Sequence, residues 1–222
     1  MINQARYRTD YTGEFVITET RWSAGKKTQN REWVPNPIEN QHISGRAVCI
    51  ISNDDFNDFD HTILERHRGG LLGSKKLQSY GVGKISQQMR LNFTVETSSE
   101  SLAEIKSRKY QEENIVYTTT RNCLLNPGEF YLIPYNPSMC VEALVLYLAA
   151  FDNHKEIFII GANKDTAGSN SAWTDHMARI FDTYRSTQFI SVGRPHNVVE
   201  HWFDSPNFKS MAHREFISYC DC

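Results

Sequence analysis

The sequence predicts a three-layer, Rossmann-like α/β domain, in which helices cover both faces of a mainly parallel sheet. Two short apolar runs, 47–51 and 156–160, are continuous rather than alternating, which is typical of strands buried on both faces. Helical patterns separate the strand-like runs, and strand–helix–strand units of this length favour parallel pairing with right-handed crossovers. The chain has 222 residues, 40% of them hydrophobic and 23% charged, so it can bury a core of its own.

The first 45 residues are expected to form an N-terminal arm or edge hairpin, and residues 46–222 the α/β domain. One strand-like run in the arm covers 14–20. The polar stretch after it holds two tryptophans and two prolines, which are Trp22, Trp33, Pro35 and Pro37. The prolines exclude a helix there, and the tryptophans would anchor the arm on the domain.

The order of elements in the domain follows from periodicity and from turn residues. Strands are predicted at 47–51, 91–95, 114–117, 130–133, 156–160, 188–193 and 214–220. Helices are predicted at 58–67, 98–110, 139–151 and 173–184. Ser98 and Ser138 are the expected N-caps of the second and third helices, because a serine hydroxyl accepts a hydrogen bond from a free N–H of the first turn.

Charge and cysteine content narrow the class of protein. The net charge is −2, so no overall field attracts nucleic acid or an anionic membrane. The most apolar run, 139–151, is shorter than the roughly 20 residues that a bilayer requires, so we expect no membrane partner. The polar N-terminus lacks the apolar core of a secretory signal. Five cysteines at irregular spacing indicate a reducing compartment rather than a disulfide framework.

Ligands of open parallel sheets bind outside the carboxyl ends of the strands, and this rule points first to the turn after 47–51. The turn carries two acids and no glycine in the sequence Ser52-Asn53-Asp54-Asp55. Its carboxylates would repel a phosphate unless Asp54 and Asp55 held a divalent metal, because hard cations take carboxylate oxygens. The alternative is a solvated turn that caps the next helix.

The same rule points to the loop after 156–160, which spans residues 161–170. Gly161 would let a ligand approach the backbone closely. Four polar side chains of the loop could hydrogen-bond a sugar or a phosphate, and these are Asn163, Lys164, Asp165 and Ser169. The alternative is an ordinary connection, although about ten residues exceeds the usual length of such loops.

A third candidate is the segment 66–84, which is rich in glycine and in basic residues. Its predicted ligand-binding residues are Arg68, Gly69, Gly70, Lys75 and Lys76. Glycine-exposed amides next to Lys and Arg are typical of sites that hold anions, including nucleic-acid phosphates. The order of residues is not that of a Walker A loop, and the alternative is a structural glycine hinge.

No metal centre is predicted from the histidines and cysteines. Cys220 and Cys222 would lie on the same face of the predicted last strand, but a lone C-x-C pair at a terminus is a poor metal site.

The run at 67–81 resembles one found in uncharacterised proteins of tailed marine phages, especially phages of cyanobacteria. The segments 157–161, 180–184 and 187–192 are similar to the same proteins. The resemblance extends over about residues 45 to 222. It implies a phage origin.

These phage proteins look distantly related to a Rossmann-like family that includes archaeal hydroxymethylpterin pyrophosphokinase and motility accessory proteins linked to flagellin glycosylation. The resemblance implies nucleotide or nucleotide-sugar binding. In the wider group the first strand runs into a Gly-x-Gly-Pro-Ser-like turn, whereas this sequence reads Ile51-Ser52-Asn53-Asp54-Asp55 without glycine. The departure puts catalysis by the family's route in doubt.

Two functions follow as hypotheses. In the first, which the missing glycines favour, the chain is a virion-associated structural or protein-binding module rather than an enzyme. Its partners would be other phage proteins or host proteins, in the virion or the host cytoplasm, and its arm would dock on them. In the second, the chain is a nucleotide or nucleotide-sugar dependent transferase, resembling a glycosyltransferase or a pyrophosphokinase. Its catalytic acids would be Asp54, Asp55 and Asp165, and its cofactor a divalent metal.

Overall fold

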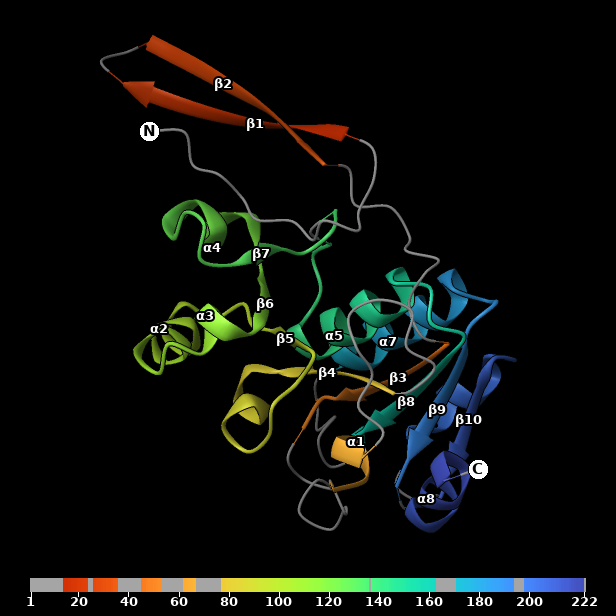
Figure 1. Cartoon of the computed structure of the whole chain (residues 1–222). Helices are drawn as coiled ribbons and strands as arrows, with labels where there is room; N and C mark the ends of the chain where they lie inside the picture. The colour runs from red at the N-terminus through yellow and green to blue at the C-terminus, as the bar shows by residue number, and fades with distance from the viewer. Residues whose placement is uncertain are drawn as a thin grey trace.

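The computed structural model describes residues 14–23, 26–35, 45–52, 62–66, 77–135, 137–162, 171–193 and 198–221. An eight-stranded sheet runs through the domain with helices on its two faces (Figure 1), which confirms the predicted three-layer α/β fold. Its strands are β3 (Arg46–Ile50), β4 (Gln78–Val82), β5 (Phe93–Val95), β6 (Ile115–Thr118), β7 (Tyr131–Leu132), β8 (Glu156–Ile160), β9 (Gln188–Val192) and β10 (Phe208–Met211). All neighbouring pairs in this sheet are parallel.

The strand order reverses once. From the centre outward the chain adds β4, β5, β6 and β7 on one side of β3, and then β8, β9 and β10 on the other. The reversal places β8 directly beside β3, with Arg46 opposite Glu156 and Ile50 opposite Ile160. The sequence-based prediction that these two runs are parallel neighbours is therefore confirmed.

Helices α5 (Val141–Phe151) and α7 (Ser171–Thr183) pack side by side on one face of the sheet, where α5 contacts β3, β4, β5 and β8. The apolar residues of α2 (Ser99–Ser107) pack on the opposite face with Val116 of β6. The remaining elements are α1 (Thr62–Arg66), η1 (Gly83–Gln87), α3 (Tyr110–Glu113), α4 (Thr120–Leu125), η3 (Glu200–Asp204) and α8 (His213–Asp221). None of the helices among the described residues is both long and apolar enough to cross a bilayer.

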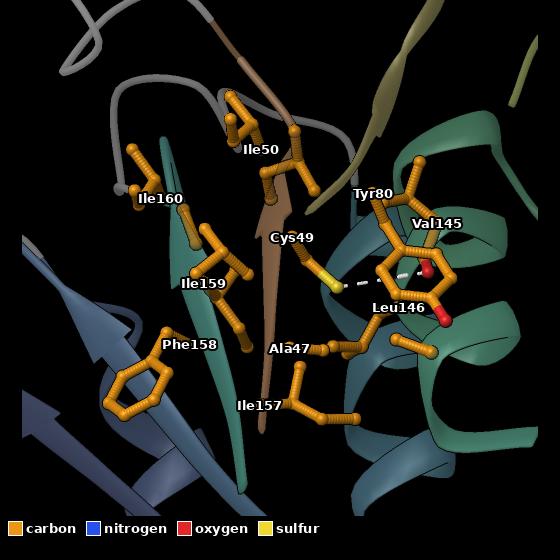
Figure 2. Close-up of a cluster of buried hydrophobic side chains, with 14 of the residues drawn as sticks. Ala47, Cys49, Ile50, Tyr80, Val145, Leu146, Ile157, Phe158, Ile159 and Ile160 are labelled. Carbon is orange, nitrogen blue, oxygen red and sulfur yellow. Dashed lines mark hydrogen bonds between the residues drawn. The ribbon is translucent and has the colours of Figure 1, made fainter. Parts of the chain in front are cut away.

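The core is centred on β3 and β8, whose apolar side chains alternate between the two helical layers. The Cys49 thiol points to α5 and donates a long hydrogen bond of 3.8 Å to the Val145 carbonyl (Figure 2). Phe158 faces the other way and packs on Phe216 of α8, with ring centroids 4.8 Å apart. Because both faces are covered, the strands are apolar at almost every position, which is why they were recognisable in the sequence.

One of the two predicted N-caps is confirmed. The Ser98 hydroxyl accepts a hydrogen bond from the Ser101 N–H at 3.4 Å, and α2 starts there. This helix stops earlier than predicted, because Lys109 adopts a left-handed φ of 55° and starts the separate short helix α3. The expected cap at Ser138 is wrong. Helix α5 begins at Val141 after Cys140, whose side chain makes no capping hydrogen bond.

The predicted last strand, 214–220, is also wrong, because these residues belong to α8. Phe216 and Cys220 are four positions apart and both are buried, as helical spacing places them on one face. Cys220 therefore lies in a helix rather than a strand, and Cys222 lies outside the described residues. The true last strand, β10, comes earlier and pairs with β9.

Strand β4 lies inside the glycine-rich segment 66–84, where the sequence predicts no strand. All five of its residues are buried, although Gln78, Ser79 and Gly81 are not typical of a strand. The Ser79 hydroxyl donates to Asn92 Oδ1 at 3.1 Å and accepts from the Asn92 N–H at 3.0 Å, so its polar atoms are satisfied. A side chain at Gly81 would collide with Leu91, whose Cδ1 would lie 2.8 Å from the added Cβ.

The arm contains a hairpin. Strand β1 (Glu14–Ser23) pairs antiparallel with β2 (Lys26–Pro35), from Glu14 opposite Pro35 to Ser23 opposite Lys26. These two strands form a sheet of their own, and Figure 1 shows the hairpin apart from the eight-stranded sheet.

Candidate functional site

The strand order reverses between β3 and β8, so the carboxyl ends of these two strands form the topological switch point of the sheet. Ligands of open α/β sheets bind at such a point. Figure 2 shows Ile50 and Ile160 side by side at the ends of these strands. The Ile51 N–H donates to the Ile160 carbonyl at 3.0 Å, which extends the pairing one residue beyond β3. The segments that follow β3 and β8 therefore leave the sheet at the same level and on the same rim.

At this rim Gly161 lies directly against the backbone of Ser52. Its φ of +83° is in the left-handed region that favours glycine. A Cβ at this position would lie 2.7 Å from the Ser52 carbonyl oxygen and 2.8 Å from the Ser52 nitrogen. No side chain fits between the two strand ends, so the peptide groups of two different loops come together where a ligand would bind.

Of the predicted site residues, the structure brings together Ser52 and Gly161. The other predicted residues of these two loops lie outside the described residues, and they are Asn53, Asp54, Asp55, Asn163, Lys164, Asp165 and Ser169. The same holds for Arg68, Gly69, Gly70, Lys75 and Lys76 of the basic segment. Their roles stay predictions.

The rim continues across the neighbouring strands to Gly83 after β4 and Glu96 after β5. Glu96 is only 6% exposed. Its Oε1 accepts hydrogen bonds from the Thr97 and Ser98 N–H groups at 2.8 and 2.9 Å. Its Oε2 lies against Gly83, where an added Cβ would be 2.5 Å away.

Glu96 was missed in the sequence, although a signal for it existed. It directly follows the strand predicted at 91–95, and the rule that selected the turns after 47–51 and 156–160 applies equally there. What the sequence does not show is that Gly83 makes room for the carboxylate.

A cleft of about 180 Å³ begins at Gly83 and lies between η1 and α2. Its lining residues are Gly83, Lys84, Gln87, Ser101, Glu104, Ile105 and Arg108. Gln87 Nε2 donates to Glu104 Oε1 at 2.6 Å, which occupies one oxygen of the only acid in the lining. With Lys84 and Arg108 also present, the formal charge of the lining is +1, from two cations and one anion.

Cys49, Cys123 and Cys140 form no disulfide, and burial makes their thiols poor nucleophiles. Burial raises the pKa of Cys123 to about 12 and that of Cys140 to about 11, and it raises the pKa of Cys49 as well. Within the part of the chain that the structure describes, no three His, Cys, Asp or Glu side chains are grouped as a metal site would require.

No protein-family model, curated protein or solved structure matches the chain.

Proposed function

We propose that this protein binds a nucleotide or a nucleotide sugar at the crevice between β3 and β8 and uses it as the donor in a group-transfer reaction. The observation that carries the proposal is the contact of Gly161 with the Ser52 backbone at the point where the strand order reverses. In open parallel sheets this crevice is the ligand site, and the contact brings backbone groups of both loops together at its mouth.

The chemistry assigned to the site comes from the loops that start at this rim. Asp54 and Asp55 follow Ser52 in the chain, and Asp165 follows Gly161. In the proposed reaction these acids would hold a divalent cation, and such a cation would supply positive charge for the phosphate oxygens and for the leaving nucleotide. Lys164 would supply a further positive charge.

A thermal-shift panel tests this proposal. It would contain the common nucleoside mono- and diphosphates and their sugar conjugates, each with and without Mg²⁺ or Mn²⁺. A ligand at 100 times its Kd stabilises the native state by about 2.7 kcal/mol, or roughly 5 to 10 °C for a chain of this length. We expect at least one metal-dependent shift of this size.

The test variant is the double substitution Asp54→Asn, Asp55→Asn. Its matched control is Asp58→Asn, which changes an acid of the same segment that is not assigned to the metal. The double variant should lose the metal-dependent shift, and Asp58→Asn should keep it. If no nucleotide stabilises the wild-type chain, or if the double variant responds like the wild type, the proposal is wrong.

A second candidate function, a virion-associated module that binds other phage proteins or host proteins, is favoured by the hairpin. Strands β1 and β2 pair with each other in a sheet of their own. A two-stranded hairpin is marginally stable in water at best, so a partner surface would add to its stability. Mass spectrometry of purified virions tests this candidate, since a virion component must be found there in a fixed ratio to the capsid protein.

A further inference from the structure

The rim holds a second set of residues that the proposed donor site does not use, and they directly follow β4 and β5. We propose that Glu96, Gly83 and the cleft between η1 and α2 form a subsite for a phosphorylated sugar. In this subsite Glu96 Oε2 accepts hydrogen bonds from the sugar hydroxyls, and Lys84 binds the phosphate. The inference rests on the proposed function in one respect, since it assigns the subsite to a second, sugar-containing substrate or to the sugar part of the donor.

The first argument is the state of the Glu96 carboxylate. A carboxylate that is 6% exposed needs hydrogen bonds to offset the loss of water, and Oε1 has two from backbone N–H groups. The described residues supply no hydrogen-bond donor to Oε2. A carboxylate oxygen accepts hydrogen bonds only, and ribose hydroxyls are donors that an acidic side chain binds in the dinucleotide sites of open α/β sheets.

The second argument is the way the chain makes room for this group. The added Cβ at Gly83 would lie 2.5 Å from Oε2 and 3.2 Å from Cδ, so any other residue would displace the carboxylate. The φ of Gly83 is not in the left-handed region, so the backbone itself does not require glycine here. Space for Glu96 is what glycine provides at this position.

The third argument is the cleft, because Gly83, which lies against the Glu96 carboxylate, is one of its lining residues. Its volume of about 180 Å³ corresponds to roughly six waters, which is enough for a phosphate and part of a sugar ring. Lys84 follows Gly83 directly and is exposed, and among the described residues no carboxylate pairs with it. Arg108 is held at the cleft by hydrogen bonds to the Ser86 carbonyl and hydroxyl at 3.4 and 3.2 Å.

The placement of charges favours a ligand with separate neutral and anionic parts. The anion would be repelled by Glu96 itself, so the phosphate belongs at Lys84 and Arg108, and the hydroxyls at Glu96. Glu104 is the acid in the lining of the cleft, and its Oε1 already accepts a hydrogen bond from Gln87.

The test is a titration of the ¹⁵N-labelled full chain with ribose 5-phosphate, followed through the amide signals of Gly83, Thr97 and Ser98. We expect these signals to shift in a saturable manner. Inorganic phosphate alone and ribose alone should each bind at least tenfold more weakly, because each makes only part of the contacts.

The key variant is Glu96→Gln, which keeps an oxygen for the Thr97 and Ser98 N–H groups and replaces Oε2 by an amide donor. Losing a hydrogen bond to a charged group should weaken ribose 5-phosphate binding roughly 10- to 100-fold. Lys84→Ala should weaken it as well. Glu100→Gln, an exposed acid in the first turn of α2, is the matched control and should bind like the wild type.

The results separate this inference from the proposed function. Nucleotide binding at Ser52 and Gly161 without any ribose 5-phosphate response at Gly83 would refute the subsite and leave the donor site intact. The reverse pattern would refute the donor site alone. Equal affinity of the wild type and Glu96→Gln for ribose 5-phosphate would overturn the role assigned to Oε2.

Discussion

Replacing Gly161 by alanine should destabilise the protein by about 2 to 5 kcal/mol. Two separate costs add up at this residue. A left-handed conformation costs a residue with a Cβ about 1 to 2 kcal/mol, and the φ of Gly161 is +83°. The new Cβ would also lie 2.7 to 2.9 Å from three atoms of Ser52, and overpacking of this kind costs about 1 to 3 kcal/mol.

The chain contains a control for each cost. Gly128 has a φ of +76° but nothing within 4 Å of its added Cβ, so Gly128→Ala should cost only about 1 to 2 kcal/mol. Gly45 has neither a left-handed φ nor a close neighbour, so Gly45→Ala should change stability by less than about 1 kcal/mol, toward greater stability.

The assay is urea unfolding of the wild type and the three variants, followed by tryptophan fluorescence and compared through the free energy of unfolding. The difference between Gly161→Ala and Gly128→Ala measures the contact between the ends of β3 and β8. If Gly161→Ala costs no more than Gly128→Ala, the two strand ends are not in backbone contact, and the geometry described for the crevice is wrong.

Three further predictions concern other parts of the fold. Asn207→Ala should lower the free energy of unfolding by about 2 to 4 kcal/mol in the same urea assay. The reason is that Asn207 Nδ2 donates to the Phe181, Tyr184 and Thr187 carbonyls at 3.0, 3.2 and 3.0 Å. A loss below about 1 kcal/mol would show that the Asn207 side chain does not hold the end of α7. The hydrogen bond to Glu156 raises the pKa of Tyr219, so the stability that it contributes is present below pH 10 and is lost as the pH rises through the folded-state pKa. Tyr219→Phe should flatten this alkaline loss, and an unchanged pH profile would contradict the assigned hydrogen bond. Thiol labelling of the native protein at pH 8, resolved by peptide mass spectrometry, should leave Cys140 almost unreacted. With a pKa of about 11, roughly one Cys140 side chain in a thousand is a thiolate at this pH. Rapid labelling would show that the Cys140 thiol is not desolvated.

The central strands could be predicted from the sequence because their environment is uniform. Strands β3 and β8 are covered by helices on both faces, so nearly every position is apolar, and the pairing of the two follows from the alternation of strands and helices. The position of the ligand crevice follows from the same topology without any motif.

Strand β4 could not be predicted because its stability comes from partners distant in sequence. Ser79 is satisfied by Asn92 and Gly81 is packed under Leu91, and neither relation is visible in the residue types alone. Helix α8 was predicted as a strand for a different reason. A short apolar stretch fits both the helical repeat of about 3.6 residues and the strand repeat of about two residues, and only the burial of one side of the helix decides between them.

The candidate site was predicted in part. Gly161 was selected for its position after a strand, and the structure adds the contact with Ser52 that makes glycine necessary. Glu96 was overlooked because one carboxylate after a strand is an ordinary residue until the glycine opposite it is known.

The most direct test of the account is to locate a bound nucleotide on the chain. Amide signals of Ser52, Gly161 and Ala162 would be followed while the nucleotide selected by the thermal-shift panel is added with Mg²⁺. We predict that these three signals shift most and saturate together. Saturable shifts confined to the opposite edge of the sheet, at Gly45 and Glu156, would contradict the assignment of the crevice as the ligand site.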